Sequence, residues 1–157
     1  MAAERLGGAS LPRPEAAAFD GRTLRVRTAA GVLDLDLSGG VGPAAGVEPA
    51  AVPDTARMSR SVRTRRGWLA LDESGRLGPG AADRGPFDGL AAVDGLAWAA
   101  GDGRLVLLDP RDGAQLAAID VDGRPRWVAP VPGGRGSIIL TDAGEAWRID
   151  LERRGGE

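Results

Sequence analysis

Asp-Gly dipeptides recur along this chain and divide it into short apolar segments. They stand at Asp20-Gly21, Asp88-Gly89, Asp94-Gly95, Asp102-Gly103, Asp112-Gly113 and Asp122-Gly123. Glycine accepts the positive φ of a tight hairpin turn, and the aspartate side chain favours the same turn. No apolar segment keeps a helical period for three turns. The pattern therefore predicts an all-β chain of antiparallel meander sheets.

The first hairpin covers residues 23–37 and turns at Ala29-Ala30. Sorting its apolar residues onto one face pairs Leu24 with Leu35, Val26 with Leu33 and Arg25 with Asp34. An opposite-charge pair across two strands contributes about 0.2–1 kcal/mol. A register slipped by two residues also sorts the faces, and it pairs Arg25 with Asp36.

Two more hairpins lie nearer the C-terminus. The hairpin at 96–109 turns at Asp102-Gly103 and is apolar on both faces, so we expect both faces to be covered. The hairpin at 137–151 turns around 142–144, which would place Ile138 near Trp147 and Ile139 near Ala146.

These segments share one phrase: an apolar strand, a turn that ends in glycine, and a second strand. From residue 87 to 151, with the connector LDPRDGAQL at 108–116, the chain resembles blades of the broad β-propeller class that includes WD40-like, quinoprotein-like and YVTN-like repeats. It lacks the Trp-Asp dipeptide of WD40 repeats and the docking motifs of quinoprotein blades. The resemblance implies a small four-bladed β-propeller or an open propeller-like arc, a habit of binding partners, and no cofactor.

The resemblance also implies a domain plan. One domain would span 14–153, with blades at 19–52, 56–88, 89–121 and 124–151, between disordered tails at 1–13 and 154–157. The last blade holds only three strands, and residues 14–19 are the candidate for its fourth. An open arc would instead leave sheet edges for another chain, so a homo-oligomer is a further expectation.

Composition argues against catalysis. The 20 basic residues are all arginine, and the chain contains no cysteine or histidine. This excludes thiolate and imidazole chemistry, the commonest zinc ligands and a Schiff-base lysine. We expect no enzyme activity, no cofactor and no metal. The net charge of −2 makes nucleic acid and membrane surfaces poor partners. No apolar run is long enough for a membrane helix. The cytoplasm is therefore the expected location.

Two features are candidates for binding. The first is the set of four tryptophans, which we expect to lie in the core between blades: Trp68, Trp98, Trp127 and Trp147. The alternative for each is an aromatic anchor for a partner.

The second feature is an arginine segment without acidic residues between Asp54 and Asp72; its basic residues are Arg57, Arg60, Arg63, Arg65 and Arg66. A solubilising edge strand is the favoured interpretation, and a patch for phosphate or an acidic partner is the alternative. No aromatic residue is interleaved in this segment, which argues against nucleic acid.

The acidic pairs Asp34/Asp36, Asp109/Asp112 and Asp120/Asp122 do not have the spacing of a calcium loop, so turn chemistry explains them better. The sequence therefore predicts a non-catalytic, propeller-like binding or scaffold module, as an accessory subunit of a larger assembly. The alternatives are a propeller that binds or hydrolyses a small ligand through a central carboxylate and arginine pocket, and a propeller relic that is stable only on its partner.

Overall fold

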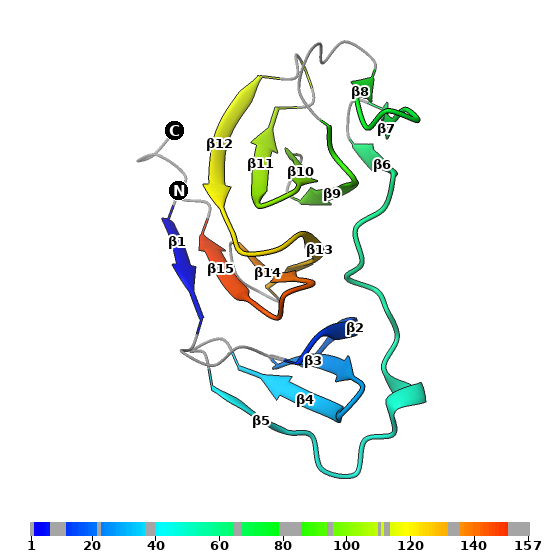
Figure 1. Cartoon of the computed structure of the whole chain (residues 1–157), viewed down its shortest axis with the longest axis vertical. Coiled ribbons are helices and arrows are strands. Elements are labelled where there is room, and N and C mark those ends of the chain that lie inside the picture. The colour runs from blue at the N-terminus through cyan, green and yellow to red at the C-terminus, as the bar shows by residue number, and fades with distance from the viewer. Residues whose placement is uncertain are drawn as a thin grey trace. The chain divides into compact units, whose positions relative to one another are not determined.

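The computed structural model describes residues 2–6, 12–21, 23–36, 40–64, 67–78, 86–93, 96–109, 111, 114–131 and 136–150. Over these residues the protein is all-β, with four antiparallel sheets and one 3-10 turn at Pro49–Ala51 (Figure 1). The predicted class of antiparallel meander sheets is confirmed. In the described part of the chain, no helix is long and apolar enough to cross a membrane.

The chain divides into two compact units, Met1–Arg57 with Trp127–Glu157, and Met58–Arg126. One sheet of the first unit follows chain order and consists of β2 (Pro14–Asp20), β3 (Thr23–Thr28), β4 (Gly31–Leu35) and β5 (Val41–Pro43). The sheet at the end of the chain is ordered β1-β15-β14-β13 and consists of β1 (Ala2–Arg5), β13 (Pro125–Pro130), β14 (Ser137–Thr141) and β15 (Ala146–Asp150). The first of the described strands therefore pairs with the last of them.

The second unit holds the other two sheets. The shorter sheet consists of β6 (Ser61–Thr64), β7 (Gly67–Leu71) and β8 (Leu77–Gly78). The longer sheet consists of β9 (Gly89–Val93), β10 (Leu96–Gly101), β11 (Arg104–Leu108) and β12 (Gln115–Asp120). Consecutive strands pair in both sheets, as short connections favour.

Each unit has its own apolar core. In the first unit the buried cluster joins residues of both sheets, among them Ala17, Leu24, Val26, Leu35, Trp127, Ala129, Ile138 and Leu140. In the second unit it joins β7 and β8 to the longer sheet through Leu69, Leu71, Leu77, Phe87, Leu90, Ala97, Ala99, Val106 and Leu108. Within each cluster the contributing positions alternate along a strand, because successive side chains point to opposite faces.

Two of the three predicted hairpins have the predicted register. β3 and β4 pair Leu24 with Leu35, Val26 with Leu33 and Arg25 with Asp34, so the register slipped by two residues is wrong. β10 and β11 meet at the Asp102-Gly103 turn, where Gly103 has a φ of 74°. Their apolar residues are buried on both faces: Ala97, Trp98, Ala99, Ala100, Leu105, Val106, Leu107 and Leu108.

The predicted register of the third hairpin is wrong by one residue. Ile139 pairs with Trp147, and Leu140 pairs with Ala146. The backbone N–H of Thr141 donates to the carbonyl of Glu145, so three residues, 142–144, form the connection. Three-residue connections commonly end in a left-handed glycine, and Gly144 has a φ of 84°.

The N-terminal predictions also need correction. Residues 14–19 were expected to complete the last sheet, but they form β2, beside β3. The strand that completes the last sheet is β1, which lies inside the expected tail at 1–13 and pairs antiparallel with β15. Asp88-Gly89, expected to be a turn, lies at the start of β9, where Gly89 pairs with Ala100.

Candidate binding surface

The predicted arginine segment does not form one surface. Arg57 belongs to the first unit, where its Nε donates to Asp54 Oδ2 at 2.7 Å and its guanidinium lies 5.5 Å from the centre of the Trp127 ring. Asp54 Oδ1 also accepts from Trp127 Nε1 at 2.8 Å and from the backbone N–H of Ala17 at 3.3 Å. Arg57 is thus part of a cluster that joins β2 to β13.

Arg60 and Arg63 belong to the second unit. Arg60 Nη2 donates to the backbone carbonyl of Asp72, which anchors the side chain without neutralising its charge. Arg63 is exposed in β6, and none of the described carboxylates pairs with it. Arg65 and Arg66 lie outside the described residues.

Trp68 in β7 is the residue that sequence reasoning misplaced. Leu69 and Leu71 enter the core, so Trp68 lies on the opposite face of the sheet and is 64% exposed. The expected core position is wrong for Trp68. Burial is confirmed for Trp98 and Trp127. Trp147 is half-buried, and its Nε1 donates to Glu145.

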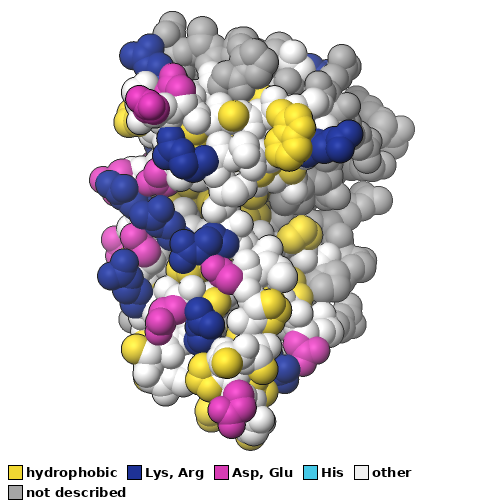
Figure 2. Space-filling view, turned by 90° about the vertical axis from the view of Figure 1, so that its right-hand side faces the viewer, with side chains coloured by type: hydrophobic (Ala, Val, Ile, Leu, Met, Phe, Trp, Pro, Cys, Tyr) yellow, Lys and Arg dark blue, Asp and Glu magenta, His cyan; other side chains and the backbone are white. Residues whose placement is uncertain are grey.

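Trp68 and Arg63 are direct partners across β7 and β6. The next pair on the same face is Ser61 with Ala70, both small and exposed. We call these four residues the Trp68 face. Figure 2 looks at the side of the molecule that carries β6–β8 and shows a large hydrophobic side chain directly beside a basic one. The aromatic residue that is missing from the arginine segment is therefore supplied by the neighbouring strand.

A fixed negative charge lies in the turn between β7 and β8. Asp72 Oδ1 accepts from the backbone N–H of Arg76 at 2.9 Å and from the hydroxyl and backbone N–H of Ser74 at 2.8 and 2.9 Å. These hydrogen bonds hold the pKa of Asp72 below its usual value. This carboxylate is engaged within its own turn.

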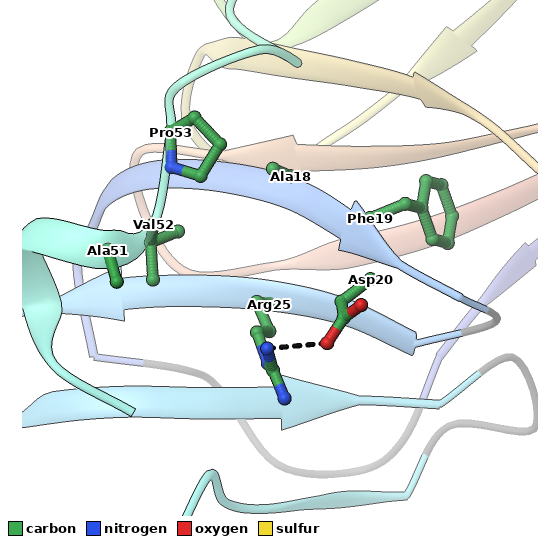
Figure 3. A pocket seen from close by; sticks show the side chains of 7 residues that line it. All are labelled: Ala18, Phe19, Asp20, Arg25, Ala51, Val52 and Pro53. Atoms are coloured by element: carbon green, nitrogen blue, oxygen red, sulfur yellow. Dashed lines mark ion pairs between the residues drawn. The ribbon is translucent and has the colours of Figure 1, made fainter. Parts of the chain in front are cut away.

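A pocket in the first unit is the nearest match to the predicted carboxylate and arginine pocket. It has a volume of about 240 Å³ and is lined by Ala18, Phe19, Asp20, Arg25, Ala51, Val52 and Pro53 (Figure 3). Arg25 pairs with Asp20 at 2.5 Å and with Asp34 at 3.2 Å. Because two carboxylates balance the guanidinium, the pocket does not favour an anion. Its volume is also below the roughly 300–1,000 Å³ that is common for ligand sites.

Of the acidic pairs, Asp36 and Asp109 accept hydrogen bonds in turns, as expected. The expectation of turn chemistry is wrong for Asp34, which lies in β4, and for Asp120, which lies in β12. Asp109 accepts from the backbone N–H of Arg111 at 2.9 Å and pairs with its guanidinium at 2.6 Å. Asp112 lies outside the described residues. Across the described ranges, no group of three or more acidic, histidine or cysteine side chains could hold a metal ion.

Comparisons of the chain with protein-family models, with curated proteins and with solved structures gave no match.

Proposed function

We propose that this chain is a non-catalytic, propeller-like module that binds another protein and serves as an accessory or scaffold subunit. The observation that carries the proposal is the exposed indole of Trp68 directly across the strand pair from Arg63. Tryptophan and arginine are enriched among the residues that dominate the affinity of protein interfaces. A tryptophan on a sheet supplies a large, rigid contact area at a low cost in side-chain entropy.

The proposed four-bladed propeller agrees with the strand order. Within three of the four sheets, the described strands pair strictly in chain order, as they do in propeller blades. In the remaining sheet, β1 lies beside β15, which resembles a propeller blade completed by the opposite terminus of the chain. Rigid blades would hold the Trp68 face in place for a partner. An open arc remains the alternative architecture.

Affinity purification from the native host, under gentle conditions, tests the binding function. We expect the full-length chain to retain a defined partner at constant stoichiometry, and we expect Trp68→Ala to lose it. Leu116→Ala is the matched control, because Leu116 is also a large exposed residue of the second unit, at 51%. Recovery of no partner, or of the same partner with Trp68→Ala, would contradict the proposal.

Light scattering coupled to size exclusion tests the architecture. A closed propeller predicts the mass of one chain at all concentrations. An open arc with unpaired sheet edges predicts a mass that rises with concentration.

A further inference from the structure

All four residues of the Trp68 face are exposed. Arg63 and Trp68 stand beside the small pair Ser61 and Ala70 on the same side of the sheet. On the opposite side of β7, Leu69 and Leu71 pack in the core. These contacts fix the strand that carries the Trp68 ring. An aromatic residue can bury about 150–250 Å² of surface. The exposed indole of Trp68 therefore offers a large contact area to a side chain that packs on it.

Among the four residues of the Trp68 face the charged one is basic, Arg63, although the chain as a whole carries −2. Arg63 has no carboxylate partner among the described residues, and Arg60 is held by a backbone carbonyl. Asp72, in the turn after β7, keeps its negative charge, but its Oδ1 accepts from the N–H groups and hydroxyl of that turn and does not pair with Arg63. The complement of this face is therefore acidic, because guanidinium groups suit carboxylates.

A nucleic acid strand fits this face less well than a peptide. Sequence-tolerant binding of single strands uses successive aromatic platforms along a basic groove. The other described aromatic rings of the second unit are buried: Trp98 lies in β10, and Phe87 is covered by the guanidinium of Arg104 at 5.4 Å. Trp68 therefore offers one platform, which is enough for one apolar side chain.

We propose that the Trp68 face binds an acidic protein segment, in which a large apolar residue packs on Trp68 and a neighbouring carboxylate pairs with Arg63. This inference rests on the proposed binding function and adds the chemistry of the partner. Trp68 and Arg63 are both exposed, so variants at both positions should fold.

The test titrates the full-length chain, labelled with ¹⁵N, with a short synthetic peptide in which glutamates alternate with leucines. The indole N–H resonance of Trp68, assigned by its loss in Trp68→Phe, should shift, while that of buried Trp98 should stay in place. Arg63→Glu should weaken the binding of the peptide at least about tenfold. The substitution replaces the guanidinium that pairs with a peptide carboxylate by a second carboxylate, which repels it. Arg13→Glu is the matched control, because Arg13 is exposed in the first unit and the net charge changes equally.

Three results would overturn the inference: no shift at Trp68, equal binding of a peptide with lysine in place of glutamate, or tighter binding of an oligodeoxythymidine than of the acidic peptide. The last result would identify the surface as a nucleic acid site. If the host partner is retained in a Trp68-dependent way but the acidic peptide does not bind, the proposed function stands and this inference fails. If neither binds, both fail.

Discussion

Asp54 shows how a single carboxylate stabilises the first unit. It receives N–H groups from Trp127, Arg57 and Ala17, which come from three separate segments of the chain. We expect Asp54→Ala to lower the free energy of unfolding by about 2–4 kcal/mol, because the buried indole N–H loses its acceptor and the guanidinium its counter-charge. Urea denaturation followed by circular dichroism measures the loss.

Asp20→Ala is the control for this experiment. Asp20 is also a carboxylate paired with an arginine, but it is 60% exposed, and Arg25 keeps Asp34 as a partner. Exposed ion pairs contribute about 0–1 kcal/mol. An equal effect of the two substitutions would show that the Asp54 cluster is not structural.

Asp72 makes the stability depend on pH in a predictable direction. Its pKa in the folded protein lies below the usual 3.8, so the unfolded chain binds the proton first as the pH falls. The stabilisation is fully present above about pH 4–5 and is lost as the pH falls through the folded pKa. We expect the difference in unfolding free energy between the wild type and Asp72→Ala to be largest near pH 7 and to shrink towards pH 3. A difference that grows on acidification would contradict this assignment, and urea titrations at several pH values measure it.

At the scale of single residues, the alternation of side chains along β7 could have predicted that Trp68 is exposed. In GWLAL, Leu69 and Leu71 occupy one face of a strand, so Trp68 must lie on the other. The prediction of a core position followed the general burial of tryptophan instead of this local period. The pairing of Trp68 with Arg63 depends on the register of β6 and β7, which the sequence alone leaves open.

At the scale of elements, the registers of two hairpins could be predicted because their turns and their alternation agree. Alternation alone allows Arg25 to pair with Asp34 or with Asp36 in the first hairpin, and the two-residue connection Ala29-Ala30 gives the pairing with Asp34. In the third hairpin, all five residues of β14 are buried, and the apolar residues Ile138, Ile139 and Leu140 are consecutive. Alternation therefore cannot choose its register, and the length of the connection decides it.

The Asp102-Gly103 turn should respond sharply to substitution. Gly103 has a φ of 74°, and the nearest atom to an added Cβ would be 3.7 Å away, so conformation and not space sets the cost. We expect Gly103→Ala to lower the free energy of unfolding by about 1–2 kcal/mol. Gly42→Ala in β5 is the control, since a Cβ there meets nothing within 4 Å and the backbone is not left-handed. It should be neutral or slightly stabilising, and equal losses in the two variants on thermal or urea denaturation would refute the conformational explanation.

At the scale of the whole molecule, the pairing of the first strand with the last is the feature that local sequence reasoning could not supply. The segment AAER of β1 has neither β-branched residues nor alternation. Its partner β15 lies at the other end of the sequence, and the register joins Ala2 to Asp150 and Arg5 to Trp147. Only the unfinished last sheet pointed to a missing strand, and the longer apolar segment at 14–19 was the more obvious candidate.

This pairing predicts the effect of removing residues 1–6. The deletion uncovers the backbone N–H and C=O groups of β15 and removes Leu6, which is 5% exposed in the first core. Burial of a leucine side chain contributes about 1.5–3 kcal/mol, and a free sheet edge promotes association. We therefore expect a lower free energy of unfolding and a larger mass by light scattering than for the intact chain. A synthetic peptide with the sequence of residues 1–6 should reverse both changes, because it can pair with β15 in place of β1. A truncated chain with unchanged mass and stability would mean that β1 does not hold the last sheet together.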